Sequence, residues 1–166
     1  MFENHTDAYA AVRDLINKEA FFLDRRRWDD WLTLYSEEAV FWVPSWASEE
    51  EPVSDPETSL NLMYLTSRNA LSDRVFRLRT KDSLASVPLD RTTHVVGTII
   101  VTHAARAEIE ASANWVVHSF GRHGGFTRGG YYDYVLESSG PELRIKRKKI
   151  TLLDDRLETA VDFYHL

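Results

Sequence analysis

Residues Ala39 to Trp46, with the sequence AVFWVPSW, form the stretch on which the predicted fold depends. The part from Ala39 to Val43 has no clearly polar face, which predicts a short strand that is buried on both sides. Pro44 has no amide hydrogen to donate to a neighbouring strand, so we expect it to end this strand. A strand that is apolar on both faces needs a cover on each face, which is either a helix of the same chain or a partner subunit.

Two helical patterns precede this strand. Thr6 is the expected N-cap of the first, a helix of about five turns whose apolar residues recur at steps of three and four. Arg25 to Arg27 interrupt the pattern, and Trp28 to Tyr35 then form a second, short helix. Ser36 to Glu38 are expected to be the turn into the strand. The apolar stripe of the first helix consists of Tyr9, Val12, Ile16, Ala20 and Leu23.

An acidic segment follows the strand. Residues Ala47 to Thr58 carry five carboxylates and two prolines, which is typical of a solvated loop. Ser59 to Thr66 alternates well enough to be a short strand, and Asn69 to Leu84 is expected to be a helix. The apolar side of that helix is formed by Leu71, Val75 and Leu78.

The second half of the chain has the alternation of β-strands. Gly121 to Gly130 contains five of the seven glycines, which predicts a hairpin loop. In the last strand the apolar positions change parity between Ile145 and Ile150, which indicates a β-bulge that bends the sheet. The predicted strands are Thr93 to Thr102, Ala107 to His118, Tyr131 to Glu137 and Leu143 to Leu153.

Helices first and a bent sheet afterwards predict an α+β fold in which the helices pack on one face of the sheet. A chain of 166 residues is most simply one domain, spanning residues 1–166. Three N-terminal helical segments and a strongly bent antiparallel sheet suggest a cone-shaped half-barrel, with the helices on its concave face and a pocket at one end. This is the arrangement of the nuclear-transport-factor-2-like (NTF2-like) fold, which also includes ketosteroid isomerases, SnoaL-type proteins and scytalone dehydratase.

Composition excludes several classes of function. The net charge of −6 argues against a nucleic-acid partner, which requires a basic surface. No apolar run approaches the roughly 18 residues of a membrane span, and the polar, acidic N-terminus is unlike a signal peptide, so a cytoplasmic location is expected. The chain has no cysteine, which excludes disulfides, a thiolate zinc site and a Rieske cluster, since the cluster needs two cysteines and two histidines.

The histidines do not indicate a metal site. A non-haem iron site needs two histidines and a carboxylate that face one another, and no helical HxxxH or HExxH pairing occurs here. His94 and His103 stand at opposite ends of one predicted strand, roughly 30 Å apart at the rise of a strand, so they cannot share an ion. We therefore expect no metal in this chain.

One group of residues could form a proton-transfer site in the predicted pocket. A histidine, a carboxylate and a tyrosine are what a dehydratase or an isomerase requires, and these are present as His94, Asp24, Tyr132 and Tyr134. The alternative is a polar core whose members satisfy one another, in which His94 and Arg91 tie loops to the sheet by hydrogen bonds.

Four segments carry a resemblance to a known family. They are DRRRWDDWLTLYSEEAVFWVPSW (Asp24 to Trp46), LSDRVFRLRT (Leu71 to Thr80), RTTHVV (Arg91 to Val96) and the ending VDFYHL (Val161 to Leu166). Together they resemble the small (β) subunit of aromatic-ring-hydroxylating Rieske non-haem iron dioxygenases of the benzoate, anthranilate and halobenzoate type.

The resemblance implies a non-catalytic, structural subunit without a cofactor of its own. Its partner would be a large (α) subunit that carries a Rieske [2Fe-2S] cluster and a mononuclear Fe(II), in an assembly of three chains of each kind. The enzyme would form a cis-dihydrodiol from a benzoate-like acid, with O2 and electrons from NADH. Two alternatives stay open, which are a stand-alone dehydratase or isomerase that uses His94 and a carboxylate, and a small-ligand binding protein of the same fold.

An assembly subunit needs contact residues. Aromatic side chains and arginines are common anchors of interfaces. The basic run Arg144 to Lys149 has three possible interpretations. It is a solvated strand face, a set of charges that prevents another strand from pairing with a sheet edge, or a surface that binds an acidic partner. The interface candidates are Trp42, Trp46, Arg91 and Arg147.

Overall fold

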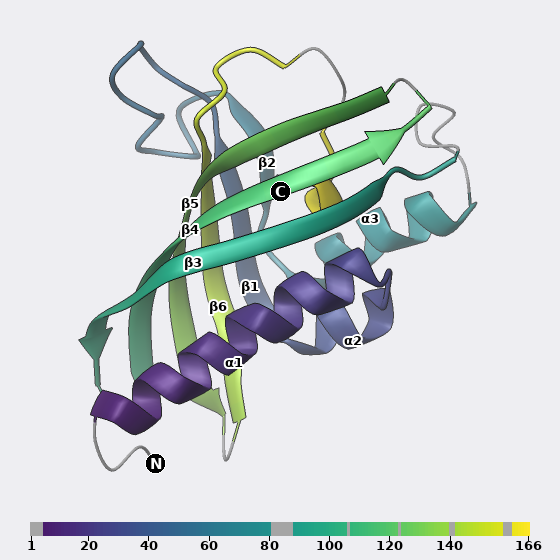
Figure 1. Cartoon of the computed structure of the whole chain (residues 1–166). Coiled ribbons are helices and arrows are strands. Elements are labelled where there is room, and N and C mark those ends of the chain that lie inside the picture. Colours follow the sequence, from purple (N-terminus) through teal and green to yellow (C-terminus); the bar gives the residue numbers. More distant parts are fainter. Residues whose placement is uncertain (1–4, 81–87, 106, 123, 140–141, 158–160) are drawn as a thin grey trace.

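The computed structural model describes residues 5–80, 88–105, 107–122, 124–139, 142–157 and 161–166. Three helices and two strands come first, and four long strands follow (Figure 1). The elements are α1 (His5–Asp24), α2 (Trp28–Thr33), β1 (Tyr35–Pro44), β2 (Asn61–Leu65), α3 (Arg68–Thr80), β3 (Arg91–Ala104), β4 (Glu108–Gly121), β5 (Gly124–Ser139), β6 (Glu142–Leu152) and the 3-10 helix η2 (Phe163–His165).

The strands form one curved, open sheet in the order β2-β1-β6-β5-β4-β3. The three helices lie together on one side of it, and α1 packs against β3 and β6 (Figure 1). The predicted α+β, NTF2-like architecture is confirmed. The expectation of a wholly antiparallel sheet is wrong at one place, because β1 and β6 pair in parallel. A parallel pair needs a long crossover connection, and residues 45–141, which include β2, α3 and the strands β3 to β5, provide it here.

The predicted β-bulge is confirmed in β6. Leu136 of β5 pairs with Ile145, while the preceding residue, Val135, pairs with Arg147. Lys146 is therefore the extra residue on β6. The bulge restores the alternation, so that Ile145, Lys148 and Ile150 all point into the core.

The prediction of a loop from Gly121 to Gly130 is wrong, since Gly121 pairs with Gly124 across a tight hairpin and β5 starts there. Gly124, with φ of 99°, serves the turn of this hairpin, whereas Gly129 and Gly130 lie in the strand where the neighbouring backbone approaches closely. A Cβ atom on Gly130 would lie 1.9 Å from the carbonyl oxygen of Thr151. Glycine is used here for close backbone approach rather than for a turn.

Three details of the N-terminal half also differ from the predictions. Thr6 lies within α1 and is not its N-cap. Ser36 to Glu38 belong to β1, and Tyr35 starts that strand instead of ending α2. Tyr9 is exposed and Ala20 only half-buried. The buried stripe of α1 consists of Ala8, Val12, Leu15, Ile16, Glu19 and Leu23.

The other elements agree with their predictions. The helix expected from Asn69 to Leu84 is α3, which begins at Arg68 and buries the expected apolar residues; its expected end at Leu84 lies outside the described residues. The short strand expected from Ser59 to Thr66 is β2. The alternation expected from Ala107 to His118 is present in β4.

Strand β1 is buried on both faces, as predicted, and residues of the same chain provide both covers. Phe41 and Val43 enter the main core. Trp42 points to the other face, where the ammonium of Lys149 lies 4.7 Å from its ring centroid and its Nε1 donates a hydrogen bond to Asn61 Oδ1 at 2.6 Å. A partner subunit is therefore not needed to bury this strand.

The C-terminal residues complete the core on the helical side. The ring of Phe163 stacks on Trp31, with centroids 4.6 Å apart, and meets Trp28 edge-on at 5.4 Å. Phe163, Tyr164 and Leu166 are all buried. The ending VDFYHL is thus part of the hydrophobic core. Within the described residues, no helix is long and apolar enough to cross a membrane.

Candidate functional site

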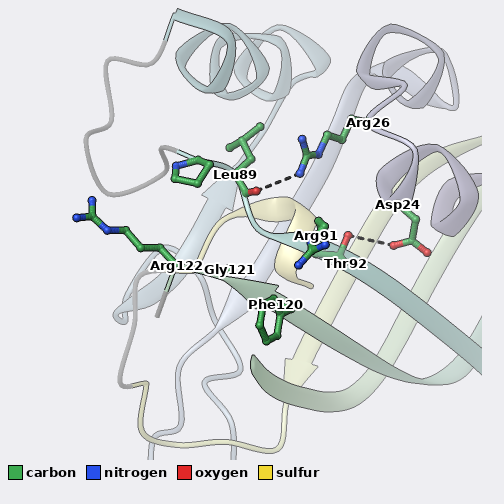
Figure 2. Close-up of a pocket in the computed structure, with 9 residues that line it drawn as sticks. Asp24, Arg26, Leu89, Arg91, Thr92, Phe120, Gly121 and Arg122 are labelled. Atoms are coloured by element: carbon green, nitrogen blue, oxygen red, sulfur yellow. Dashed lines mark hydrogen bonds between the residues drawn. The ribbon is translucent and has the colours of Figure 1, made fainter. Parts of the chain in front are cut away.

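The end of α1 places two charged residues beside the start of β3. Arg26 ends the helix in the left-handed region with φ of 53°, and the Arg27 amide donates to the Phe22 carbonyl oxygen at 2.8 Å. A left-handed residue with a Cβ costs about 1–2 kcal/mol. The Arg26 side chain offsets this cost, because its Nη2 donates to the carbonyl oxygens of Leu89 and Asp90 at 3.0 and 3.1 Å (Figure 2).

The carboxylate of Asp24 joins α1 to β3. It accepts a hydrogen bond from the Thr92 hydroxyl at 3.1 Å (Figure 2). It also accepts one from the His94 backbone amide at 2.9 Å. Its Oδ1 lies 2.6 Å from Nδ1 of the His94 ring. The other ring nitrogen of His94, Nε2, is 3.1 Å from the main-chain oxygen of Leu166. The His94 ring therefore connects α1, β3 and the C-terminal residues.

This pair is poorly placed for proton transfer to a substrate. The His94 side chain is only 1% exposed, and both of its nitrogens face acceptors of the same chain. Burial works against ionisation of Asp24, but the hydrogen bonds from His94 outweigh it and hold the pKa of Asp24 below its usual value. Asp24 is thus an ionised anchor for His94. A general base would instead need an open path to its substrate.

A substitution of His94 separates the two interpretations. His94→Ala should lower the free energy of unfolding by about 1–3 kcal/mol, because Asp24 and the Leu166 oxygen lose a buried partner. Turnover per assembled complex should stay within a few-fold of the wild type. His118→Ala is the matched control, since His118 is exposed and contacts Thr127 at 3.1 Å. Urea unfolding and steady-state kinetics give the two readouts. A loss of several orders of magnitude in turnover, with assembly intact, would instead make His94 a catalytic residue.

A second polar cluster lies deeper in the core. The carboxylate of Glu19, on the buried stripe of α1, accepts hydrogen bonds from the Tyr35 hydroxyl, from the Tyr134 hydroxyl at 2.8 Å and from Lys148 Nζ at 2.9 Å. Lys148 Nζ also lies 3.9 Å from the centroid of the Tyr132 ring. Both members of the ion pair are buried, with side chains 2% and 1% exposed.

The electrostatics of this buried cluster keep the tyrosines protonated. Burial raises the pKa of Tyr35 and Tyr134 well above the usual value, and the negative charge of Glu19 adds to the effect. Burial also lowers the pKa of Lys148, while Glu19 opposes that change. The hydroxyls and the ammonium are therefore donors to one carboxylate, and the cluster stabilises the core.

The four residues predicted to converge fall into two groups. His94 and Asp24 are in contact, whereas Tyr134 and Tyr132 belong to the buried cluster around Glu19 and Lys148. Because the predicted apolar stripe of the first helix was built from apolar residues only, sequence reasoning did not single out Glu19. Its spacing from Ile16 and Leu23 was a signal that it lies on the apolar stripe. Lys148 was not recognised as a buried residue, because the bulge in β6 moves it from the solvent face, which strict alternation with Ile145 predicts, to the core face.

His165 is a third buried polar group. Its Nδ1 accepts a hydrogen bond from the Asp162 amide at 3.2 Å, and its Nε2 lies 3.3 Å from Asp90 Oδ2. Burial lowers the pKa of His165 to about 4, although the charge of Asp90 opposes this change. A neutral ring agrees with the geometry, because the Nδ1 atom that accepts from Asp162 cannot also carry a proton.

An open groove lies at the mouth of the cone, beside Asp24 (Figure 2). Its volume is about 600 Å³. We call it the arginine groove, because three arginines from three parts of the chain and one aromatic ring line it: Arg26, Arg91, Arg122 and Phe120. The remaining lining residues are Asp24, Pro88, Leu89, Thr92 and Gly121.

The donor set of this chain does not fit the cofactors of a ring-hydroxylating dioxygenase. A Rieske cluster requires cysteine ligands, and the sequence has none. Within the described residues, no three histidine, aspartate or glutamate side chains are grouped so that they could hold a metal ion. No reaction step is therefore assigned to a metal bound by these residues.

The four interface candidates lie in different environments. Trp42 is 8% exposed and covered by its own chain. Trp46 is half-buried, and its Nε1 donates to the Leu152 carbonyl oxygen at 2.8 Å. Arg91 and Arg147 are exposed. Their part in an interface stays a prediction, and the two arginines offer more free surface than the two tryptophans.

Comparison with known proteins agrees with the resemblance seen in the sequence. Residues 18–159 match the family model described as ring hydroxylating beta subunit. The chain is 38% identical to the 2-halobenzoate 1,2-dioxygenase small subunit of Burkholderia cepacia, over 96% of both chains.

Solved structures give the same result. The crystal structure of the β subunit of the benzoate 1,2-dioxygenase from Burkholderia mallei is 30% identical and matches with a TM-score of 0.79, over 100% of this chain and 99% of that one. A scytalone dehydratase-like protein from Novosphingobium aromaticivorans shares the fold alone, with 12% identity and a TM-score of 0.68 over 93% of this chain and 91% of that one. This chain belongs to the family of β subunits of ring-hydroxylating dioxygenases, and such subunits are parts of oxidoreductase complexes.

Proposed function

We propose that this chain is the non-catalytic small subunit of a dioxygenase that acts on a benzoate-like aromatic acid. The observation that carries the structural role is the closed environment of His94, whose two nitrogens both face groups of its own chain. A stand-alone dehydratase or isomerase would need this histidine open to its substrate. The substrate class rests on the names of the relatives, which are subunits of benzoate and 2-halobenzoate dioxygenases.

The proposed complex divides the work between two kinds of chain. The large subunit would hold the Rieske cluster and the mononuclear Fe(II), and would receive electrons from NADH through a reductase. Both atoms of O2 would enter the ring to give a cis-dihydrodiol. Three small subunits would form one layer against three large subunits in the cytoplasm. The absence of cysteine from this chain supports the placement of the cluster on the partner.

Reconstitution tests this proposal. The chain should co-purify with its large subunit as one sedimenting species, and that complex should convert a benzoate to its cis-dihydrodiol with NADH and a reductase. The isolated small chain should contain no stoichiometric iron and show no Rieske absorbance. A chain that stays apart from the large subunit at high concentration, or that binds iron stoichiometrically when alone, would contradict the proposal.

A further inference from the structure

The loop between β1 and β2, residues 47–58, presents its charges outward, and we call it the acidic loop. Its first part is closed back on itself, because the Ala47 amide donates to the Glu51 carbonyl oxygen at 2.9 Å and the Val53 amide donates to the Ser45 carbonyl oxygen at 2.8 Å. Val53 is buried and anchors the loop. The side chains of Glu49, Glu50 and Glu51 are exposed, and no ion pair joins them to another described residue.

The arginine groove carries positive charge, in contrast to the acidic loop. Arg26 donates to main-chain carbonyl oxygens, Arg91 lies 5.2 Å above the ring centroid of Phe120, and Arg122 is exposed. Within the part of the chain that the structure describes, no carboxylate forms an ion pair with any of these three arginines. The carboxylate of Asp24 in the groove is already engaged by His94 and Thr92. On a chain of net charge −6, this groove is a local surplus of positive charge.

Apolar surface accompanies the charges on both sides. Leu60 follows the acidic loop and is 85% exposed, and Phe120 in the groove is 49% exposed. The exposed leucine and the exposed ring could cover one another in an intermolecular contact. A pairing of opposite charges around a small apolar contact is a common composition of protein interfaces.

One chain cannot bring its own loop and groove together. The loop between β1 and β2 lies at one side of the sheet, whereas the start of β3 and the end of α1, which form the groove, lie at the other (Figure 1). Two complementary surfaces on different sides of a subunit produce a head-to-tail contact. Repetition of such a contact closes a ring when the rotation between copies divides a full turn, and otherwise extends into an open filament.

We propose that the arginine groove of one small subunit receives the acidic loop of a second copy, and that this contact closes the ring of small subunits. The proposal rests on the proposed function, since it supplies the contact that holds the layer of small subunits together. Glu49, Glu50 and Glu51 of one copy would face Arg91 and Arg122 of the next. Arg26 serves mainly to hold its own backbone.

Charge reversal tests this contact in the complex with the large subunit and in the small subunit alone. The variants are Arg91→Glu with Arg122→Glu, Glu50→Lys with Glu51→Lys, and the combination of all four substitutions in one chain. All four side chains are exposed, so each variant should fold. Arg13→Glu with Lys18→Glu is the control, because it changes the net charge by the same amount on the exposed face of α1. Sedimentation velocity over a concentration series measures association, and circular dichroism checks the fold.

Each two-site reversal should weaken association of the small subunits at least about tenfold at low salt. The four-site variant should recover most of that loss because it restores the opposite charges with their signs exchanged. The control should stay within twofold of the wild type. If the wild type forms the complex and all reversals leave association within twofold, the inference is overturned while the proposed function stands. A wild-type chain that stays monomeric in the presence of its large subunit would overturn both.

Discussion

Lys148→Met is expected to lower the free energy of unfolding by about 3–5 kcal/mol, because it leaves the carboxylate of Glu19 buried without its cation. The two groups are 2.9 Å apart and almost completely shielded from water. Desolvation of a carboxylate is expensive, and the two tyrosine hydroxyls that remain are neutral donors. Equilibrium urea unfolding, followed by tryptophan fluorescence, measures the loss.

The same strand offers a matched control. Lys146 Nζ lies 2.7 Å from Glu108 Oε2, but this pair is on the surface, with side chains 52% and 39% exposed. Lys146→Met should therefore lower the free energy of unfolding far less than Lys148→Met does, because solvent screens an exposed ion pair. If Lys146→Met and Lys148→Met lowered the free energy of unfolding equally, burial would not increase the contribution of the Glu19–Lys148 pair to stability.

A double variant shows how much of the loss comes from the unpaired charge. Glu19→Gln combined with Lys148→Met removes both charges. The two tyrosine hydroxyls face different oxygens of Glu19, so the glutamine oxygen can accept from one hydroxyl while its NH2 group donates to the other. This variant should be more stable than Lys148→Met alone, since no isolated buried charge remains. A double variant that is less stable than Lys148→Met alone would contradict this account.

Phe163→Ala is expected to cost about 3–5 kcal/mol, which is typical of a large cavity in a core. The ring is completely buried between Trp31 and Trp28 and lies only a few residues from the end of the described chain. Loss of the ring would remove the stack on Trp31 and leave an empty space beside α2. Thermal unfolding and the near-ultraviolet circular dichroism of the tryptophans should both report the change.

Phe76→Ala is the control for this substitution. Phe76 lies on α3 and is 63% exposed, so its removal should change the free energy of unfolding by less than about 0.5 kcal/mol. A small effect at position 163 would mean that the C-terminal residues are peripheral, and the proposed tie between His94 and Leu166 would lose its physical basis.

Local patterns identified the core-facing residues of several elements, although the stripe predicted for α1 was wrong at Tyr9 and Ala20. The alternation of β4, the stripe Leu71, Val75 and Leu78 on α3, and the doubly buried β1 all follow from side-chain periodicity. Burial of apolar side chains selects these patterns, and periodicity is a property of the sequence alone. The change in parity of the apolar positions along β6 predicted its bulge for the same reason.

Close backbone contacts could not be inferred in this way. The glycines from Gly124 to Gly130 looked like a loop, because glycine in a sequence has the same appearance whether it permits a turn or makes room for a neighbour. The tertiary structure separates the two uses, since Gly124 has φ of 99° in the turn and Gly130 makes room for the backbone of Thr151. The parallel pairing of β1 with β6 could not be inferred from local patterns either, since it joins segments that are about a hundred residues apart.

For the candidate site, the residue types alone limit which chemistry is available, whereas the packing of the whole chain sets which groups meet. The absence of cysteine excludes a Rieske cluster in any fold of this chain, because no other side chain supplies its thiolates. His94 and Asp24 could be chosen as partners from residue type, yet the contact of the His94 ring with the Leu166 oxygen depends on how the C-terminal residues return to the core. The pairing of Glu19 with Lys148 depends on a bulge and a helix phase together. Long-range contacts of this kind are set by the packing of the whole chain, and no local stretch of sequence contains them.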